Sequence, residues 1–182
     1  TEMKEKITKE IELPENSAVS VDEKSLTIKC LKEVKREFNQ RSVSIRIEGR
    51  KIVLESRSGT KEDKKIIGSI VAHIKNMING SQREHTYTLK ICSGHFPMNV
   101  SVAGSKFIIK NFLGEKVPRT LNLKAGAEVK VEGDIIHVTS PDKETAGQVS
   151  ADIEQLTRRP GYDTRIFQDG IYIINKDGKE LK

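Results

Sequence analysis

The sequence predicts an α+β fold of two tandem homologous domains, each an antiparallel sheet of hairpins with one packed helix. Three features lead to this prediction: a repeat of about half the chain, short runs in which apolar and polar residues alternate, and one apolar stripe at helical spacing in each copy. The chain has 182 residues, a length that fits either two small domains or one large one. Because the sequence repeats over about half its length, we expect two small domains.

The internal repeat consists of segments that match in the same order along the chain. Three of the pairs are 19–21 with 100–102, 44–49 with 128–133, and 52–56 with 136–140. Each copy is longer than the unit of a solenoid, so the copies are predicted to be sibling domains. We place a first domain at 1–80, a polar linker at 81–86, a second domain at 87–160 and a C-terminal extension at 161–182.

Alternating runs place similar strands in both copies. The first copy has predicted strands at 18–21 and 26–30, and then a hairpin of 43–47 with 51–55. The second copy has a strand at 87–91, a turn at 103–105, and a hairpin of 128–131 with 135–139. Gly49 and Gly133 suit the two hairpin turns, because glycine accepts a positive φ without steric cost.

One helix is predicted to close each copy. In the first, Thr60 to Asp63 has the form of a capping box. The apolar stripe behind it consists of Ile66, Ile67, Ile70, Ile74 and Met77. In the second copy we expect Ser140 to cap a helix with Pro141 at its first position. The stripe of that helix is Val149, Ile153 and Leu156.

The composition indicates a folded, basic protein. With 35% hydrophobic residues the chain is too apolar for a disordered tail. A net charge of +6 favours a polyanionic partner, although many proteins carry a few extra lysines on a solvated face. Two isolated cysteines and the lack of any apolar run of membrane length lead us to expect a soluble, cytoplasmic protein.

No motif for catalysis stands out. The four histidines are scattered, and no phosphate-binding glycine loop or metalloprotease motif is present. Cys92 to His95 has the form of half a zinc site without a second half. The segment 56–60 could hold an anion at a helix N-terminus, but a plain capping loop is the favoured interpretation. We therefore expect no catalytic residue, no metal and no cofactor.

Basic and aromatic residues gather in the second half and the tail, which we expect to be the cationic part of the chain. Such side chains neutralise phosphates and stack on unpaired bases. We expect Phe167 and Tyr172 to lie in the core. The candidate RNA-binding residues are His95, Phe96, Lys106, Lys110, Lys116, Arg119, Arg158, Arg159, Tyr162, Arg165 and Lys176.

Three segments make the chain similar to a known family. Arg165 to Ile173 resembles the signature Arg-x-Phe-x-Asp-Gly-aliphatic-Tyr-aliphatic of the archaeal and eukaryotic branch of large-subunit ribosomal protein L-six. Segments 73–80 and 95–98 resemble the end of that family's first helix and the loop that opens its second domain. The linker at 81–85 departs from the more usual version, which contains Gly-Phe.

The resemblance implies a structural constituent of the large ribosomal subunit, without enzymatic activity. It implies binding to large-subunit rRNA near the translation-factor binding region, between the sarcin–ricin loop and the stalk base. Neighbouring ribosomal proteins and translational GTPases are the further partners we expect. Two alternatives stay open, a protein-interaction module that docks translation factors or ribosomal proteins, and an enzyme that acts on nucleic acid.

Overall fold

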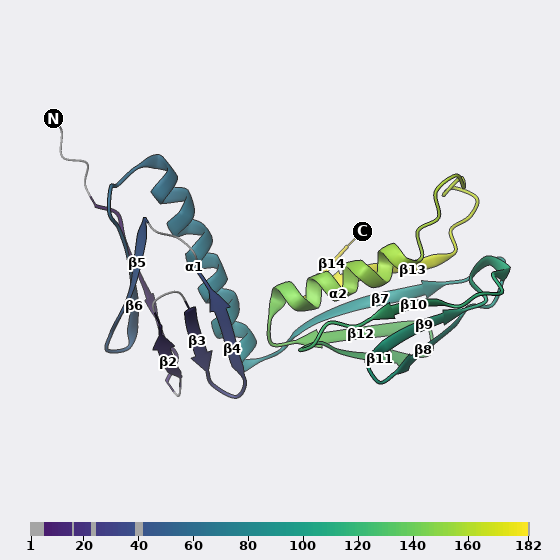
Figure 1. The fold of residues 1–182 in the computed structure, drawn as a ribbon, viewed down its shortest axis with the longest axis horizontal. Helices are drawn as coiled ribbons and strands as arrows, with labels where there is room; N and C mark the ends of the chain where they lie inside the picture. The colour runs from purple at the N-terminus through teal and green to yellow at the C-terminus, as the bar shows by residue number, and fades with distance from the viewer. Residues whose placement is uncertain (1–5, 16, 23–24, 39–41, 182) are drawn as a thin grey trace. The chain divides into compact units, whose positions relative to one another are not determined.

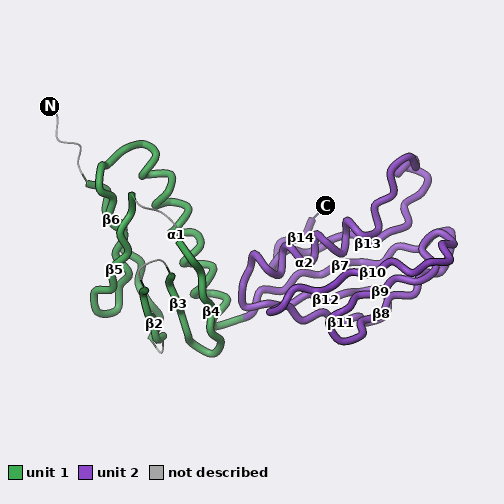
Figure 2. Tube along the Cα trace, in the orientation of Figure 1, with its two compact units in different colours: residues 1–83 green, residues 84–182 purple. Residues whose placement is uncertain are grey.

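The chain forms two compact units in the computed structural model, which describes residues 6–15, 17–22, 25–38 and 42–181. Unit 1 comprises residues 1–83 and unit 2 residues 84–182 (Figure 2). Both units combine antiparallel sheets with one α-helix, so the predicted α+β fold of two repeated domains is confirmed. The predicted linker at 81–86 coincides with the end of the first helix and the start of the next strand.

Unit 1 contains two three-stranded sheets and one long helix (Figure 1). Its elements are β1 (Thr8–Glu12), β2 (Ala18–Val21), β3 (Ser25–Lys29), β4 (Glu33–Glu37), β5 (Val43–Glu48), β6 (Lys51–Ser56) and α1 (Lys61–Gln82). The sheets have the orders β1-β6-β5 and β2-β3-β4, and α1 packs on β3, β4, β5 and β6.

Unit 2 repeats this plan and adds to it. Its elements are β7 (His85–Cys92), β8 (Asn99–Ala103), β9 (Lys106–Lys110), the 3-10 turn η1 (Phe112–Gly114), β10 (Arg119–Asn122), β11 (Glu128–Glu132), β12 (Ile135–Ser140), α2 (Lys143–Leu156), β13 (Gly170–Lys176) and β14 (Lys179–Glu180). The sheets have the orders β10-β9-β8 and β11-β12-β7-β13-β14. The C-terminal segment thus extends the larger sheet on the free side of β7.

The sheet orders show the duplication directly. Sheet β1-β6-β5 of unit 1 corresponds to β7-β12-β11 of unit 2, and β2-β3-β4 corresponds to β8-β9-β10. Alternation did not predict β1 or β4, because each buries one apolar residue among charged ones, Ile11 and Val34 respectively. Such strands are stabilised by pairing with their neighbours more than by their own pattern.

Helix α1 begins as predicted. Thr60 is its N-cap, and its side chain accepts a hydrogen bond from the Asp63 backbone N–H while Asp63 Oδ2 accepts one from the Thr60 N–H. Both bonds satisfy backbone donors that the first helical turn leaves unpaired. The predicted stripe faces the core, with Ile67, Ile70, Ile74 and Met77 buried, whereas Ile66 is only partly buried.

Loss of the α1 cap should destabilise the chain measurably. We expect Thr60→Ala to lower the free energy of unfolding by about 1 kcal/mol, because the Asp63 N–H loses its acceptor. Urea denaturation of the full chain measures this change. Thr60→Ser retains the hydroxyl and is the matched control. Equal stability of Thr60→Ala and Thr60→Ser would contradict a role for the capping bond.

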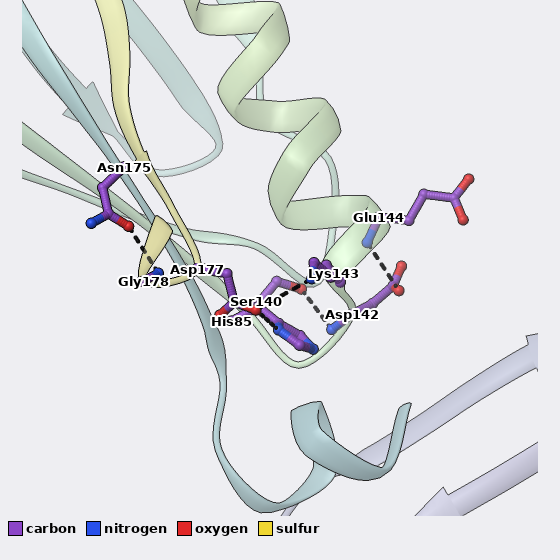
Figure 3. Close-up of polar contacts among 8 residues, drawn as sticks. All are labelled: His85, Ser140, Asp142, Lys143, Glu144, Asn175, Asp177 and Gly178. Carbon is purple, nitrogen blue, oxygen red and sulfur yellow. Dashed lines mark hydrogen bonds and ion pairs between the residues drawn. The ribbon is translucent and has the colours of Figure 1, made fainter. Parts of the chain in front are cut away.

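Helix α2 begins two residues later than predicted. Asp142, and not Ser140, is the N-cap, and its carboxylate accepts a hydrogen bond from the Glu144 N–H (Figure 3). The same carboxylate also accepts from the Thr145 N–H. The Ser140 hydroxyl accepts from the Asp142 N–H instead and donates to the Gly126 carbonyl. The expectation of a Ser140 cap was wrong because the carboxylate of Asp142 reaches two donors at once.

A polar contact ties the start of β7 to the turn between β13 and β14. The Asp177 carboxylate lies 2.8 Å from Nδ1 of buried His85 and 3.5 Å from Nζ of Lys143 (Figure 3). Burial alone would raise the pKa of Asp177, but the hydrogen bond with His85 and the nearby positive charges lower that pKa below its usual value. The contact fixes the C-terminal strands to the rest of unit 2.

Candidate nucleic-acid interface

Asp169 holds together the loop that follows β7 and the segment that precedes β13. Its carboxylate accepts hydrogen bonds from the backbone N–H groups of Gly94 and His95, the latter at 2.9 Å, and contacts His95 Nδ1. Only 3% of the Asp169 side chain is exposed. Burial by itself raises the pKa of Asp169. The hydrogen bonds from the His95 and Gly94 N–H groups and from the His95 ring have the larger, opposite effect, so the pKa of Asp169 lies below its ordinary value.

Gly170 allows this segment to pass close to the end of α2. A Cβ at this position would come within 3.3 Å of the Thr157 hydroxyl and of the Tyr172 ring. The Thr157 hydroxyl accepts a hydrogen bond from the Ile171 N–H at 3.0 Å. The Asp-Gly pair of the C-terminal signature therefore has a structural explanation: the carboxylate anchors one loop, and the glycine lets the strand begin against the helix end.

A chain of rings and one guanidinium group covers the surface above Asp169. The His95 ring stacks on Phe167 with centroids 5.0 Å apart, and Tyr162 meets Phe167 edge-on at 4.9 Å. The Arg159 guanidinium carbon lies 4.3 Å from the Tyr162 ring centroid. His95 and Tyr162 are each about 40% exposed, so both rings stay available for a flat ligand. We call this end of unit 2 the tip, defined by the loops 93–98 and 111–118 and the segment 157–169.

The tip encloses a pocket of about 520 Å³ beside the last turn of α2. Aromatic and basic side chains line it, together with the carboxylates of Glu154 and Asp169. The segment 157–169 forms most of its wall and projects from the sheet between α2 and β13 (Figure 1). Tyr172 lines the pocket and is 40% exposed, so the expectation of a core position was wrong: β13 buries Ile171 and turns Tyr172 outward.

Arg119 is engaged inside unit 2. Its guanidinium group makes two hydrogen bonds to the Glu115 carboxylate, at 2.8 and 2.7 Å, and a third to the Leu156 carbonyl at 2.6 Å. It also lies over the Phe112 ring, 4.4 Å from its centroid. The hydrogen bond from Arg119 is the main reason why the pKa of Glu115 is lowered. We infer that Arg119 positions the tip and leaves few donors for a ligand.

The other candidates differ in their position and in their freedom to bind. Lys110, Lys116 and Arg158 are exposed around the tip and have no ion pair with another described residue. Arg165 forms a two-bond ion pair with Asp163. Phe96 is half exposed and packs over Gly114, whose φ of +76° favours glycine.

Two predicted candidates lie away from the tip. Lys106 is at the opposite end of β9 from Lys110, and Lys176 is at the opposite end of β13 from Gly170. The structure therefore brings together at the tip His95, Phe96, Arg119, Arg158, Arg159, Tyr162 and Arg165. Lys116 lies in the tip loop 111–118, and Lys110 directly precedes that loop at the end of β9. It does not bring Lys106 and Lys176 to the same place.

Charge is not distributed between the halves as expected. Unit 1 has 18 Lys and Arg against 13 Asp and Glu, whereas unit 2 has 14 against 13, which gives formal net charges of +5 and +1. The expectation of a cationic second half was wrong, because the lysines and arginines of unit 2 are balanced by acidic residues. At the tip, Glu115 and Asp163 pair with arginines.

Sequence reasoning missed Asp169 and Glu115, the two carboxylates that organise the tip. Asp169 belongs to the recognised signature, which pointed to the segment but not to its partners 74 and 75 residues earlier. Glu115 stands four residues before Arg119. This spacing predicts an ion pair only where the chain makes a helical turn, and no helix was predicted in this loop.

Rings and cations gathered at one tip of a duplicated α+β fold are side chains that can bind RNA by stacking and by charge neutralisation. Residues 96–170, which include most of the tip, match the family described as Ribosomal protein L6. No helix in the described residues has both the length and the apolar character needed to cross a bilayer.

Curated relatives match nearly the whole chain. The large ribosomal subunit protein uL6 of Methanococcus vannielii is 44% identical over 176 residues, which cover 96% of this chain and 97% of the relative. The uL6 protein of Methanobrevibacter smithii is 42% identical, over 94% of this chain and 97% of the relative. The uL6 protein of Methanocella arvoryzae is 41% identical, over 92% of this chain and 96% of the relative. The chain belongs to the uL6 family of large ribosomal subunit proteins.

Membership of this family confirms the resemblance predicted from the sequence. The chain is a structural constituent of the large ribosomal subunit, and its family is not one of enzymes. Its place is the ribosome in the cytoplasm, as expected.

Proposed function

We propose that the chain binds large-subunit rRNA through the tip of unit 2 and stabilises the fold of that RNA. The observation that carries the proposal is the platform of His95, Phe167 and Tyr162, with Arg159 stacked on it and exposed cations around it. Rings and guanidinium planes stack on unpaired bases, while lysine and arginine side chains neutralise phosphates.

The tip supports both kinds of contact in a rigid setting. Asp169 fixes the loop that carries His95, and Arg119 fixes the loop 111–118 to the end of α2. The RNA-binding groups are therefore held before binding, which reduces the entropy lost when the complex forms. Lys110, Lys116 and Arg158 would contact phosphates, and Tyr162 with His95 would take an unpaired base.

The location we propose is near the translation-factor binding region, beside the sarcin–ricin loop and the stalk base. The family resemblance of the three sequence segments supports this place. Neighbouring ribosomal proteins are proposed as further contacts, and translational GTPases as transient ones. Exposed apolar side chains at the tip, including Val117 and Ile166, are compatible with docking of such proteins.

Removing the free cations of the tip tests the proposal. We expect the full chain carrying Lys110→Gln, Lys116→Gln and Arg158→Gln to bind deproteinised large-subunit rRNA of Methanococcus vannielii at least about tenfold more weakly. The slope of log affinity against log salt should fall by about 2 to 3, because each phosphate contact releases counterions. Filter binding over a salt series measures both quantities.

A matched variant separates position from charge. Lys106→Gln, Lys176→Gln and Lys179→Gln remove the same charge from exposed strand positions of unit 2 that lie away from the tip. This variant should retain most of the affinity. Equal binding by wild type and the tip variant would refute the proposal, and equal losses in both variants would show that general charge, and not the tip, determines binding.

A further inference from the structure

The outer face of helix α1 collects positive charge in unit 1. At about 100° per residue, Lys61 and Lys65 lie within roughly 20° of the line opposite the buried stripe, and Lys75 and Lys64 flank it at roughly 60° and 80°. All four are exposed, as are Gly68 and Ala72 between them. Among the described residues none of the four lysines has an ion pair, and the pairs Lys6–Glu55, Arg50–Glu15 and Lys51–Glu10 of unit 1 involve other residues.

A hollow of about 340 Å³ adjoins this face between β4 and α1. Its lining includes the cations Lys65 and Arg36, the rings of Phe38 and His73, and one acidic residue, Glu37. The Phe38 and His73 ring centroids are 6.5 Å apart, and the Arg36 guanidinium lies 6.0 Å from the Phe38 centroid. Cations and flat groups therefore occur side by side here, as they do at the tip of unit 2.

Helix α2 provides an internal comparison, because the two helices come from one duplicated unit. With the buried positions Ile70, Ile74 and Met77 matched to Val149, Ile153 and Leu156, Lys65 falls on Glu144 and Lys75 on Glu154. Gly68 falls on Gly147. The outer face of α2 also carries Asp152, which accepts a hydrogen bond from Gln148. Lysines of α1 thus stand where α2 has acidic residues, of which Glu144 is exposed, whereas Glu154 is half-buried and accepts a hydrogen bond from the Ile173 N–H.

We propose that the outer face of α1, together with the hollow beside β4, is a second RNA-binding surface that takes the sugar–phosphate backbone of the rRNA. Charge complementarity selects this occupant: from Lys61 to Lys75 the lysines extend over about 21 Å of helix, a length suited to several phosphates. Gly68 and Ala72 leave room between the lysines for close approach of the backbone.

The inference rests on rRNA being the partner proposed above, but it uses a different unit of the chain. Two attachments on one RNA strengthen each other, because binding of the first raises the effective concentration of the second. Because unit 1 carries most of the excess positive charge, we expect it to contribute a large part of the salt dependence of the rRNA affinity.

The test uses the full chain with Lys64→Gln, Lys65→Gln and Lys75→Gln. Glutamine removes the charge and retains a good helix former, so the thermal midpoint should stay close to that of wild type. Affinity for deproteinised large-subunit rRNA of Methanococcus vannielii should fall at least about tenfold, and the salt slope by about 2 to 3. The single variant Lys75→Gln should show a smaller loss in the same direction.

A control of equal charge is available within unit 1. Lys9→Gln, Lys29→Gln and Lys35→Gln remove three exposed lysines from β1, β3 and β4 and should leave affinity within about threefold of wild type. Equal affinities for the α1 variant and this control overturn the inference. If the tip variant of unit 2 still weakens binding, the proposed function survives that result; if neither variant weakens binding, both proposals fail.

Discussion

Asp169→Ala is expected to lower the free energy of unfolding by about 3 kcal/mol and to abolish most of the rRNA affinity of the tip. The substitution leaves the Gly94 and His95 N–H groups without their acceptor, and a buried unpaired donor costs roughly 1 to 3 kcal/mol. It also releases the His95 ring from the carboxylate that orients it. Denaturant unfolding and filter binding measure the two effects.

Asp169→Asn separates the charge of this side chain from its shape. The amide oxygen still accepts from the backbone, so the loss of stability should be smaller than for alanine. The pKa of Asp169 is lowered in the folded chain. The ionised Asp169 carboxylate therefore contributes fully to the free energy of unfolding at pH values above the pKa of the unfolded chain, near 3.8. This contribution is lost as the pH falls through the lower pKa of the folded chain.

Stability measured from pH 6 down to pH 2 checks the sign. Wild type should lose more stability than Asp169→Asn in the range below about pH 4, because only wild type takes up the extra proton on unfolding. Asp163→Asn, which changes an exposed carboxylate of the same loop, is the control for the alanine variant. If Asp169→Ala unfolds like Asp163→Asn, the carboxylate does not anchor the loop.

Arg119→Ala is expected to destabilise unit 2 by about 2 kcal/mol. The side chain makes a two-bond contact with Glu115 and a hydrogen bond to the Leu156 carbonyl in a partly buried position, where hydrogen bonds to charged groups are worth roughly 1.5 to 3 kcal/mol. Arg119→Lys should recover little, because an ammonium group cannot reproduce the planar pair of donors. Urea denaturation of the full chain measures the loss.

The same variant decides between the structural role of Arg119 and the RNA contact expected from the sequence. A positioning residue should lower affinity through the tip while leaving the salt slope close to that of wild type. Lys116→Ala, at an exposed neighbouring position, should do the reverse: it should flatten the slope with stability unchanged. Unchanged stability and a flatter slope in Arg119→Ala would show that this arginine contacts phosphate.

Periodicity was enough to predict most of the fold. Strands β6, β11 and β12 alternate more and less buried residues, and both helices show one apolar stripe, so local pattern and tertiary structure agree. Strands β1 and β4 escaped prediction because charged residues outnumber their one buried apolar residue. The start of α2 was misplaced because two capping side chains stand two residues apart.

The site was predictable in composition but not in its internal contacts. Rings and cations of the C-terminal segment indicated an RNA surface, whereas the anchoring of His95 by Asp169 joins residues 74 positions apart. Arg119 looked like a free cation because the Leu156 carbonyl, 37 residues later, leaves no trace in the sequence. The net charge of unit 1 can be counted from the sequence. That several of its lysines lie on the outer face of α1 follows only once the buried residues of that helix are known.

The most direct test of the central claim is local cleavage of rRNA from the tip. A chain with Cys30→Ser, Cys92→Ser and Val117→Cys carries a single thiol at an exposed tip position, to which an iron chelate can be attached. Bound to deproteinised large-subunit rRNA, this chain should generate hydroxyl radicals that cut the RNA at a few discrete places. The same chelate at Lys179→Cys, away from the tip, should cut weakly or elsewhere. Absence of discrete cuts from position 117 in a bound complex would contradict the proposed interface.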